Sequence, residues 1–147
     1  MHERKQFNQA LHDENDPRAR QYVSDWIALR WGLVCKPNPD KYGVDLIAYK
    51  KDQVRGYIEV ETRVWDKTDK CPYQSIHIAE RKEKLFSNKH TVIFVTTHNA
   101  ECAYWCNAEE VLGSPLVEVP NKYVQKNEFF YDVPIEIFRY VILDVPF

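Results

Sequence analysis

Glycine is scarce in this sequence, with four in 147 residues, and the four cysteines stand at positions 35, 71, 102 and 106. The chain has no Gly-rich loop that cradles phosphate groups, no G-x-S-x-G motif and no protein-kinase motif set. No apolar run approaches the ~20 residues that cross a bilayer, and the polar N-terminal segment lacks the apolar stretch of a signal peptide. These absences favour a cytoplasmic protein with no membrane partner, whose cysteines remain thiols.

The composition is that of an ordinary globular protein, 44% hydrophobic and 29% charged. A chain of 147 residues fits one domain, residues 1–147, with an adequate core. The net charge of -2 hides an uneven distribution. Residues 50–89 hold ten Lys and Arg against seven Asp and Glu, whereas residues 101–147 hold three against eight. The basic middle favours a polyanionic partner, although its excess of three charges is small.

Apolar spacing and turn residues predict a mixture of helices and strands. A helix is expected over 15–32, because Asp16 suits the N-cap, Pro17 the first turn and Gly32 the end. Further helices are predicted over 75–86 and 108–113. Strands are predicted over 33–36, 44–49, 55–65, 90–98, 102–106 and 115–120, with a short helix or strand in the tail 131–143. The fold class is therefore α/β or α+β, with a mixed β-sheet flanked by helices.

Three carboxylates interrupt an apolar hairpin that spans residues 43–63. If Asp52 is the tip of the turn, opposite residues sum to 104 and Asp45 faces Glu59. Alternation then places Asp45, Glu59 and Glu61 on one face. The opposite, apolar face consists of Val44, Leu46, Ala48, Ile58 and Val60. Neighbouring like charges repel each other, so a group of opposite charge is expected at the acidic face.

Two kinds of group would offset this repulsion. A divalent cation such as Mg²⁺ or Mn²⁺ prefers carboxylate oxygens completed by water. Such a cation would activate water and neutralise charge on a phosphodiester. The alternative is that the acids are ordinary residues of an outer hairpin face, paired with Arg55 and Arg63.

These features, taken in order, resemble the PD-(D/E)XK nuclease superfamily: a helix, a strand beginning "VD", a turn, the motif "IEVE" and a helix with basic residues. Asp45 matches the first Asp of the family and Glu59 its Glu. The resemblance covers residues 14–98 and leaves 99–147 as additions. It implies a metal-dependent endonuclease or exonuclease acting on nucleic acid, first of all DNA. It also implies Mg²⁺ or Mn²⁺ held by Asp45, Glu59 and the carbonyl of Val60, and it makes a homodimer an option.

The chain departs from the family at Glu61, which stands where the family has lysine, so that E-x-E replaces E-x-K. The resemblance gives Glu61 a role in binding metal, orienting water or accepting a proton. The missing cation would then come from Lys82, in the predicted helix 75–86, or from Arg63.

Other residues complete the expected site. Arg63, Arg81 and Lys84 would grip the nucleic-acid backbone. In this family an acid from the first helix often joins the metal site, and Glu14 and Asp25 are the options here. Three aromatic residues close to the acids in the chain would stack on bases or pack as ordinary core residues: Tyr42, Trp65 and Tyr73.

Two other interpretations remain open. The first is the same fold with a decayed motif, serving as a nucleic-acid-binding or protein-interaction module. The missing lysine favours this module, whereas the three retained acids disfavour it, because a DNA-binding face should shed negative charge. The second is a small zinc-bearing regulatory protein that uses His98, Cys102 and Cys106. On a strand, however, the two cysteines lie ~13 Å apart, too far to share one zinc ion.

Overall fold

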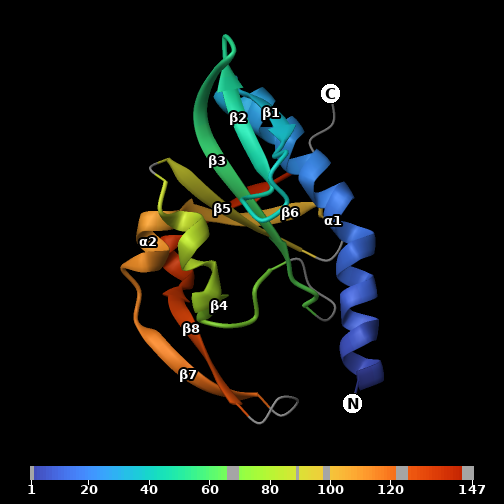
Figure 1. Cartoon of the computed structure of the whole chain (residues 1–147), viewed down its shortest axis with the longest axis vertical. Helices are drawn as coiled ribbons and strands as arrows, with labels where there is room; N and C mark the ends of the chain where they lie inside the picture. Colours follow the sequence, from blue (N-terminus) through green and yellow to red (C-terminus); the bar gives the residue numbers. More distant parts are fainter. Residues whose placement is uncertain (1, 66–69, 89, 98–99, 122–125, 144–147) are drawn as a thin grey trace.

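The computed structural model describes residues 2–65, 70–88, 90–97, 100–121 and 126–143, and for residues 2–16, 121 and 126 it describes the backbone alone. These residues form two β-sheets with helices packed around them (Figure 1). The fold is therefore a mixed α+β fold, and the predicted class is confirmed. No helix in the described part of the chain is long and apolar enough to cross a membrane.

The N-terminal helix α1, His2–Trp31, begins far upstream of its predicted start. The assignment of Asp16 as N-cap is wrong, because the stretch before it is rich in good helix formers such as Glu, Lys, Gln and Ala. Pro17 lies inside the helix, where its ring removes one backbone hydrogen bond. The predicted end is confirmed: Gly32 has a φ of 69°, and its N–H donates to the carbonyl of Ala28 at 3.2 Å.

The larger sheet has six strands in the order β1-β2-β3-β5-β6-β9. They are β1 (Val34–Pro37), β2 (Leu46–Lys50), β3 (Gln53–Thr62), β5 (Thr91–Thr96), β6 (Cys102–Asn107) and β9 (Arg139–Ile142). Neighbouring strands are antiparallel except β3 and β5, which run parallel, so the sheet is mixed. Because β6 and β9 belong to it, this sheet extends beyond the region 14–98 that resembles the nuclease core.

The smaller sheet has three strands in the order β4-β8-β7. They are β4 (Ser75–Ala79), β8 (Lys126–Pro134) and β7 (Leu116–Asn121). The helix predicted over 75–86 is wrong over its first part, because Ile76 and Ile78 alternate with more exposed neighbours and pair with β8. Its remainder is a 3₁₀ helix. The short helical elements are η1 (Glu80–Phe86), α2 (Ala108–Leu112) and η2 (Ile135–Ile137).

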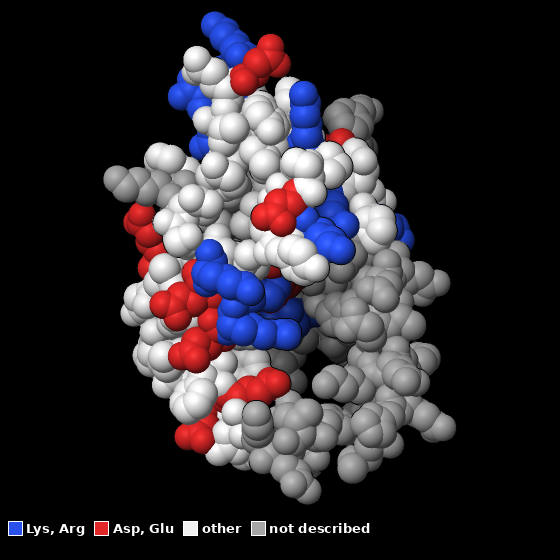
Figure 2. Space-filling model, in the orientation of Figure 1, with Lys and Arg blue, Asp and Glu red and all other residues white. Residues whose placement is uncertain are grey.

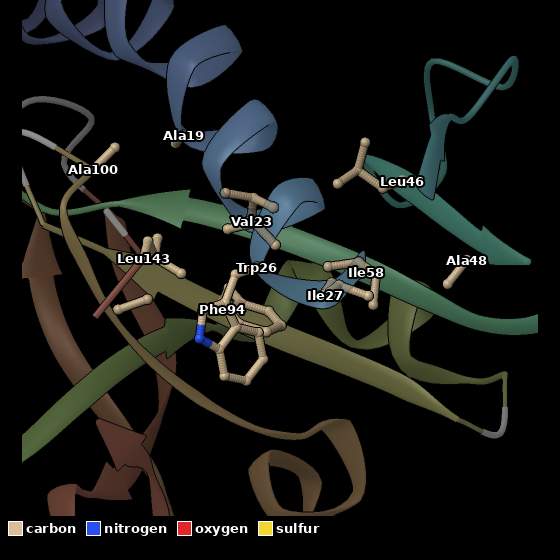
Figure 3. Packing of buried hydrophobic residues seen from close by; sticks show 12 residues of the cluster. Ala19, Val23, Trp26, Ile27, Leu46, Ala48, Ile58, Phe94, Ala100 and Leu143 are labelled. Carbon is tan, nitrogen blue, oxygen red and sulfur yellow. The ribbon is translucent and has the colours of Figure 1, made fainter. Parts of the chain in front are cut away.

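Both faces of the larger sheet are covered. Helix α1 packs on one face through an apolar cluster drawn in Figure 3. The cluster includes Ala19, Val23, Trp26 and Ile27 from α1 and Leu46, Ala48, Ile58 and Phe94 from the strands. A second apolar cluster joins the other face to the smaller sheet, η1 and α2, with Ile78, Ile93 and Val111 fully buried in it. The larger sheet is therefore the middle one of three layers.

The β2–β3 hairpin has the predicted register at its open end, where Leu46 pairs with Ile58. Near the turn the prediction is wrong. Lys50 pairs with Gln53, and the two residues between them both have positive φ, 52° and 63°, as in a two-residue hairpin turn. Arg55 becomes the extra residue of a bulge, because Ala48 pairs with Gly56 but the next residue pairs with Val54.

Candidate active site

Asp45 stands one residue before β2, where the chain enters the larger sheet. Its Oδ2 accepts a hydrogen bond from the backbone N–H of Val60 at 2.8 Å. Its Oδ1 lies 3.3 Å from a guanidinium nitrogen of Arg20, which projects from α1. The carboxylate is therefore fixed between strand β3 and helix α1.

Asn38 holds the loop that delivers Asp45. Its Nδ2 donates to the carbonyl of Val44 at 2.9 Å, and its backbone N–H donates to the carbonyl of Asp45 at 3.0 Å. Its Oδ1 accepts from the N–H of Asp40 at 3.0 Å, so both ends of the side-chain amide are used. The stretch "PNPDKYG" predicts a loop, but no local pattern in it indicates that Asn38 positions Asp45.

Glu59 and Glu61 project from β3 to the face opposite α1 and are only 5% and 9% exposed. Two buried carboxylates on one strand are costly unless cations compensate them. Lys82 compensates both, since its Nζ lies 2.8 Å from Oε2 of Glu59 and also contacts Oε1 of Glu61. Arg63 adds a second cation, 2.9 Å from Oε2 of Glu61.

Lys82 reaches the acids from η1, the short 3₁₀ helix that follows β4 directly. Strand β4 ends at Ala79 and is held by its pairing with β8. At the other end of η1, Phe86 is buried in the second apolar cluster. Because η1 is anchored at both ends, the Lys82 ammonium group stays over Glu59 and Glu61.

The protonation of the site follows from this arrangement. Burial raises the pKa of Glu59 to about 7; Lys82 opposes this rise, and Asp45 adds to it. Burial would also raise the pKa of Glu61, but Arg63 and Lys82 outweigh it and hold the pKa below the usual value. Burial would lower the pKa of Lys82, but Glu61 and Glu59 outweigh it and raise the pKa. The site therefore holds an ionised Glu61, a charged Lys82 and a Glu59 that titrates near neutral pH.

Asp45 and Glu59 fit a divalent cation. Asp45 raises the pKa of Glu59, so the two carboxyl groups are close enough to repel each other, and a shared proton or cation would relieve that repulsion. The N–H of Val60 points at Asp45, and the carbonyl of a strand residue faces the same neighbour as its N–H. Among the described residues, no group of three acidic, histidine or cysteine side chains converges on a metal-sized site. The Val60 carbonyl and water would have to complete the coordination.

The predicted backbone-gripping residues lie near this group. Besides contacting Glu61, Arg63 donates to the carbonyl of His77 at 2.8 Å. Arg81 and Lys84 are exposed on η1. Lys and Arg side chains gather on this face of the molecule with Asp and Glu beside them (Figure 2). Cations are thus available for phosphate groups next to the buried acids.

Other predicted candidates lie elsewhere. Asp25 is exposed on α1, where it accepts a hydrogen bond from Gln21 at 2.9 Å, and it is not a partner of Asp45. Cys102 and Cys106 lie on strand β6, so the separation of ~13 Å that argues against a shared zinc ion holds. Two candidates fall outside the description of side chains: Glu14 and His98.

Two cavities flank the acids. The larger, of about 480 Å³, lies between α1 and the loop before β2, and its wall includes Arg20, Lys41 and Asp45. The smaller, of about 330 Å³, lies beside Arg63. Arg20 is a site residue that the sequence does not reveal. A polar residue next to the apolar stripe of a helix looks the same whether it meets solvent or a carboxylate.

Comparison with known proteins adds no family to this geometry. No protein-family model matches the chain, and neither a curated protein nor a solved structure matches it. The resemblance to the PD-(D/E)XK nucleases therefore stays a prediction.

Proposed function

We propose that this chain is a cytoplasmic, metal-dependent nuclease that hydrolyses phosphodiester bonds, with DNA as the first expected substrate. The closeness of Asp45 to Glu59 at the open end of the hairpin carries the proposal: Asp45 raises the pKa of Glu59, and two acids that repel each other need a shared cation or a shared proton. Lys82, 2.8 Å from Glu59, supplies the positive group that the E-x-E motif itself lacks.

The metal would be Mg²⁺ or Mn²⁺ held by Asp45, Glu59 and the Val60 carbonyl, and it would supply water activation and charge neutralisation. During hydrolysis the water oxygen bonds to phosphorus while the bond from phosphorus to the leaving oxygen breaks. Lys82 would stabilise the negative charge that builds on the phosphoryl oxygens in that step.

The remaining residues have supporting roles. The lowered pKa of Glu61 makes it a weak base, so we assign it to orienting Lys82 and Arg63 rather than to accepting a proton. Arg63 would add to charge stabilisation. Arg81 and Lys84 would contact the nucleic-acid backbone and make binding depend on salt.

A decayed module that binds nucleic acid or protein is the second candidate function. It is favoured by a specific observation: each of the three acids already contacts a cation, Arg20 for Asp45 and Lys82 for both glutamates. In that case the charges compensate one another, and no metal is required.

A cleavage assay separates the two functions. The protein is incubated with single-stranded, double-stranded and branched DNA and with RNA, in Mg²⁺, Mn²⁺ or EDTA. We expect cleavage in Mg²⁺ or Mn²⁺ but not in EDTA. The variants Asp45→Ala and Glu59→Ala should lose it. The variant Asp25→Ala should retain it, because Asp25 is an exposed acid outside the site. Cleavage that persists in both site variants would remove the assignment. Absence of cleavage, with binding strengthened by Asp45→Ala, would support the decayed module.

A further inference from the structure

The smaller cavity opens directly beside the candidate active site. Its wall includes Arg63, Trp65, Tyr73, Ser75, Ile76 and His77. Arg63 belongs to both places, because it lines the cavity and its guanidinium group lies 2.9 Å from Glu61. A ligand in this cavity would therefore sit one side chain away from the buried acids.

The cavity presents one fixed and one exposed aromatic ring. Trp65 packs edge-on against Tyr104 with ring centroids 5.8 Å apart. The Tyr104 hydroxyl in turn accepts a hydrogen bond from the N–H of Cys71 at 3.0 Å, which holds the ring behind Trp65. Tyr73 is 66% exposed and contributes little to the core. A flat ligand could stack on the faces of these two rings.

The charge of the wall distinguishes this cavity from the larger one. Acidic side chains, Asp40 and Asp45, line the larger cavity, whereas no described acidic side chain lines the smaller one. Asp132 pairs with His77 at 3.2 Å but is not part of the wall. The Arg63 guanidinium is held in place by Glu61 and by the His77 carbonyl. The cavity therefore suits a flat, mainly apolar ring with a negative group next to it.

We propose that the smaller cavity binds an unpaired nucleobase of the nucleic acid that the site cleaves, stacked on Trp65 and Tyr73 with the adjoining phosphate at Arg63. The proposal rests on the nuclease function above and narrows its substrate class. A volume of about 330 Å³ is close to the lower limit of about 300 Å³ for ligand sites, which fits one nucleoside. A base inside a duplex is stacked and paired and must leave the helix to enter. The preferred substrates are therefore single strands, overhangs or frayed ends rather than blunt duplex.

Binding in EDTA tests the cavity without cleavage. A fluorescein-labelled single-stranded oligodeoxynucleotide is titrated with protein, and the same sequence as a blunt duplex is titrated in parallel, with fluorescence anisotropy as the readout. Tyr73→Ala and Trp65→Ala should each weaken single-strand binding roughly 5- to 100-fold, the usual effect of removing one stacking ring. Tyr73→Phe keeps the ring and should stay within about twofold of wild type. Duplex binding should change little in any of these variants.

Phe129→Ala is the matched control, because Phe129 is 45% exposed and lines neither cavity. Its single-strand affinity should equal that of wild type. Circular dichroism verifies folding, and if Trp65→Ala fails to fold, the exposed Tyr73 still decides the matter. Unchanged single-strand binding in Tyr73→Ala, or an equal loss on duplex, would overturn the proposal. Cleavage that needs Asp45 but not Tyr73 would overturn it while leaving the nuclease intact. Single-strand binding that depends on the two rings, without any cleavage, would support the base-binding role of the cavity and contradict the nuclease function.

Discussion

The Asp45 carboxylate accepts a hydrogen bond from the backbone N–H of Val60 at 2.8 Å. If strand β2 were longer, a backbone carbonyl would accept this bond instead. The register of the hairpin would place the carbonyl of Val44 opposite Val60, but that carbonyl bonds to Asn38 instead. A side chain has thus replaced one acceptor of the sheet ladder. Because the same carboxylate is the candidate metal ligand, its two tasks can be separated by substitution.

Asp45→Asn should separate them. The amide oxygen still accepts the N–H of Val60, so we expect a free energy of unfolding within about 1 kcal/mol of wild type. The lost charge should lower kcat at least about 100-fold, because metal binding contributes several kcal/mol to charge stabilisation. Thermal unfolding and cleavage rates in Mg²⁺ measure the two effects, with Asp25→Asn as the control that changes neither. Wild-type activity in Asp45→Asn would show that Asp45 is no metal ligand.

Lys82→Met should destabilise the protein strongly near pH 8. Glu59 and Glu61 would remain buried with Arg63 alone beside Glu61, and removing one partner of a buried ion pair costs about 3–5 kcal/mol. The loss should shrink at acidic pH, where Glu59 is protonated. Urea unfolding at both pH values measures it. Lys84→Met, on the exposed side of the same short helix, should stay within about 0.5 kcal/mol of wild type. Equal losses of unfolding free energy in the two variants would mean that the contacts of Lys82 with Glu59 and Glu61 do not stabilise the fold.

Glu59 should make the metal-free protein less stable as the pH rises. Its pKa is about 7 in the folded chain against 4.5 for an ordinary glutamate, so the folded state binds the proton more tightly. The stabilisation that the folded state gains from protonated Glu59 is complete below pH 4.5 and is lost as the pH rises through 7. Glu59→Gln removes it, and the variant should therefore gain about 2 kcal/mol relative to wild type between about pH 5.5 and 8.

Glu61→Gln is the control for that measurement. The pKa of Glu61 is lowered, so its contribution is present above the ordinary value of 4.5 and is lost only as the pH falls through the folded pKa. The stability difference between Glu61→Gln and wild type should therefore be nearly constant over the same range. Urea unfolding in EDTA gives both curves. A flat difference for Glu59→Gln would contradict the raised pKa.

Asn38→Ala should raise the Mg²⁺ concentration needed for half-maximal cleavage by about 10- to 100-fold, as for other groups that orient a metal ligand. The substitution releases the Val44 carbonyl and loosens the loop that delivers Asp45. Activity at saturating Mg²⁺ should largely recover. Asn88→Ala, at an exposed residue that lines neither cavity, should leave the Mg²⁺ requirement unchanged. The same requirement in Asn38→Ala as in wild type would contradict the positioning role.

The β2–β3 hairpin shows how far alternation can predict structure. Near the site, Leu46 and Ile58 must face the core, and a slip by one residue would bury the charges, so the register could be derived. Near the turn, residues such as Val54 and Arg55 are exposed. Nothing there is gained or lost by burial, so neither the two-residue turn nor the bulge could be predicted.

The environment of the acids was predictable only in part. Lys82 could be named from the sequence as a candidate cation for the site. The strand and short helix that lead to it could not be predicted, because the alternating pattern of Ile76 and Ile78 is followed directly by residues that favour helix. Arg20 and Asn38 reach Asp45 through contacts that depend on how α1 crosses the sheet and how the loop closes. No local pattern specifies such long-range geometry.

The chain passes back and forth between the two sheets, and this has a consequence for folding. It runs from β3 to β4, back to β5, from β6 to β7, and from β8 back to β9. Neither sheet is complete until distant segments have met, so much of the chain's entropy must be lost before the pairings stabilise it. The two sheets should therefore melt in one cooperative transition. A fragment ending at residue 98 would lack β6 and β9 together with the partner of β4, and it should not fold by itself.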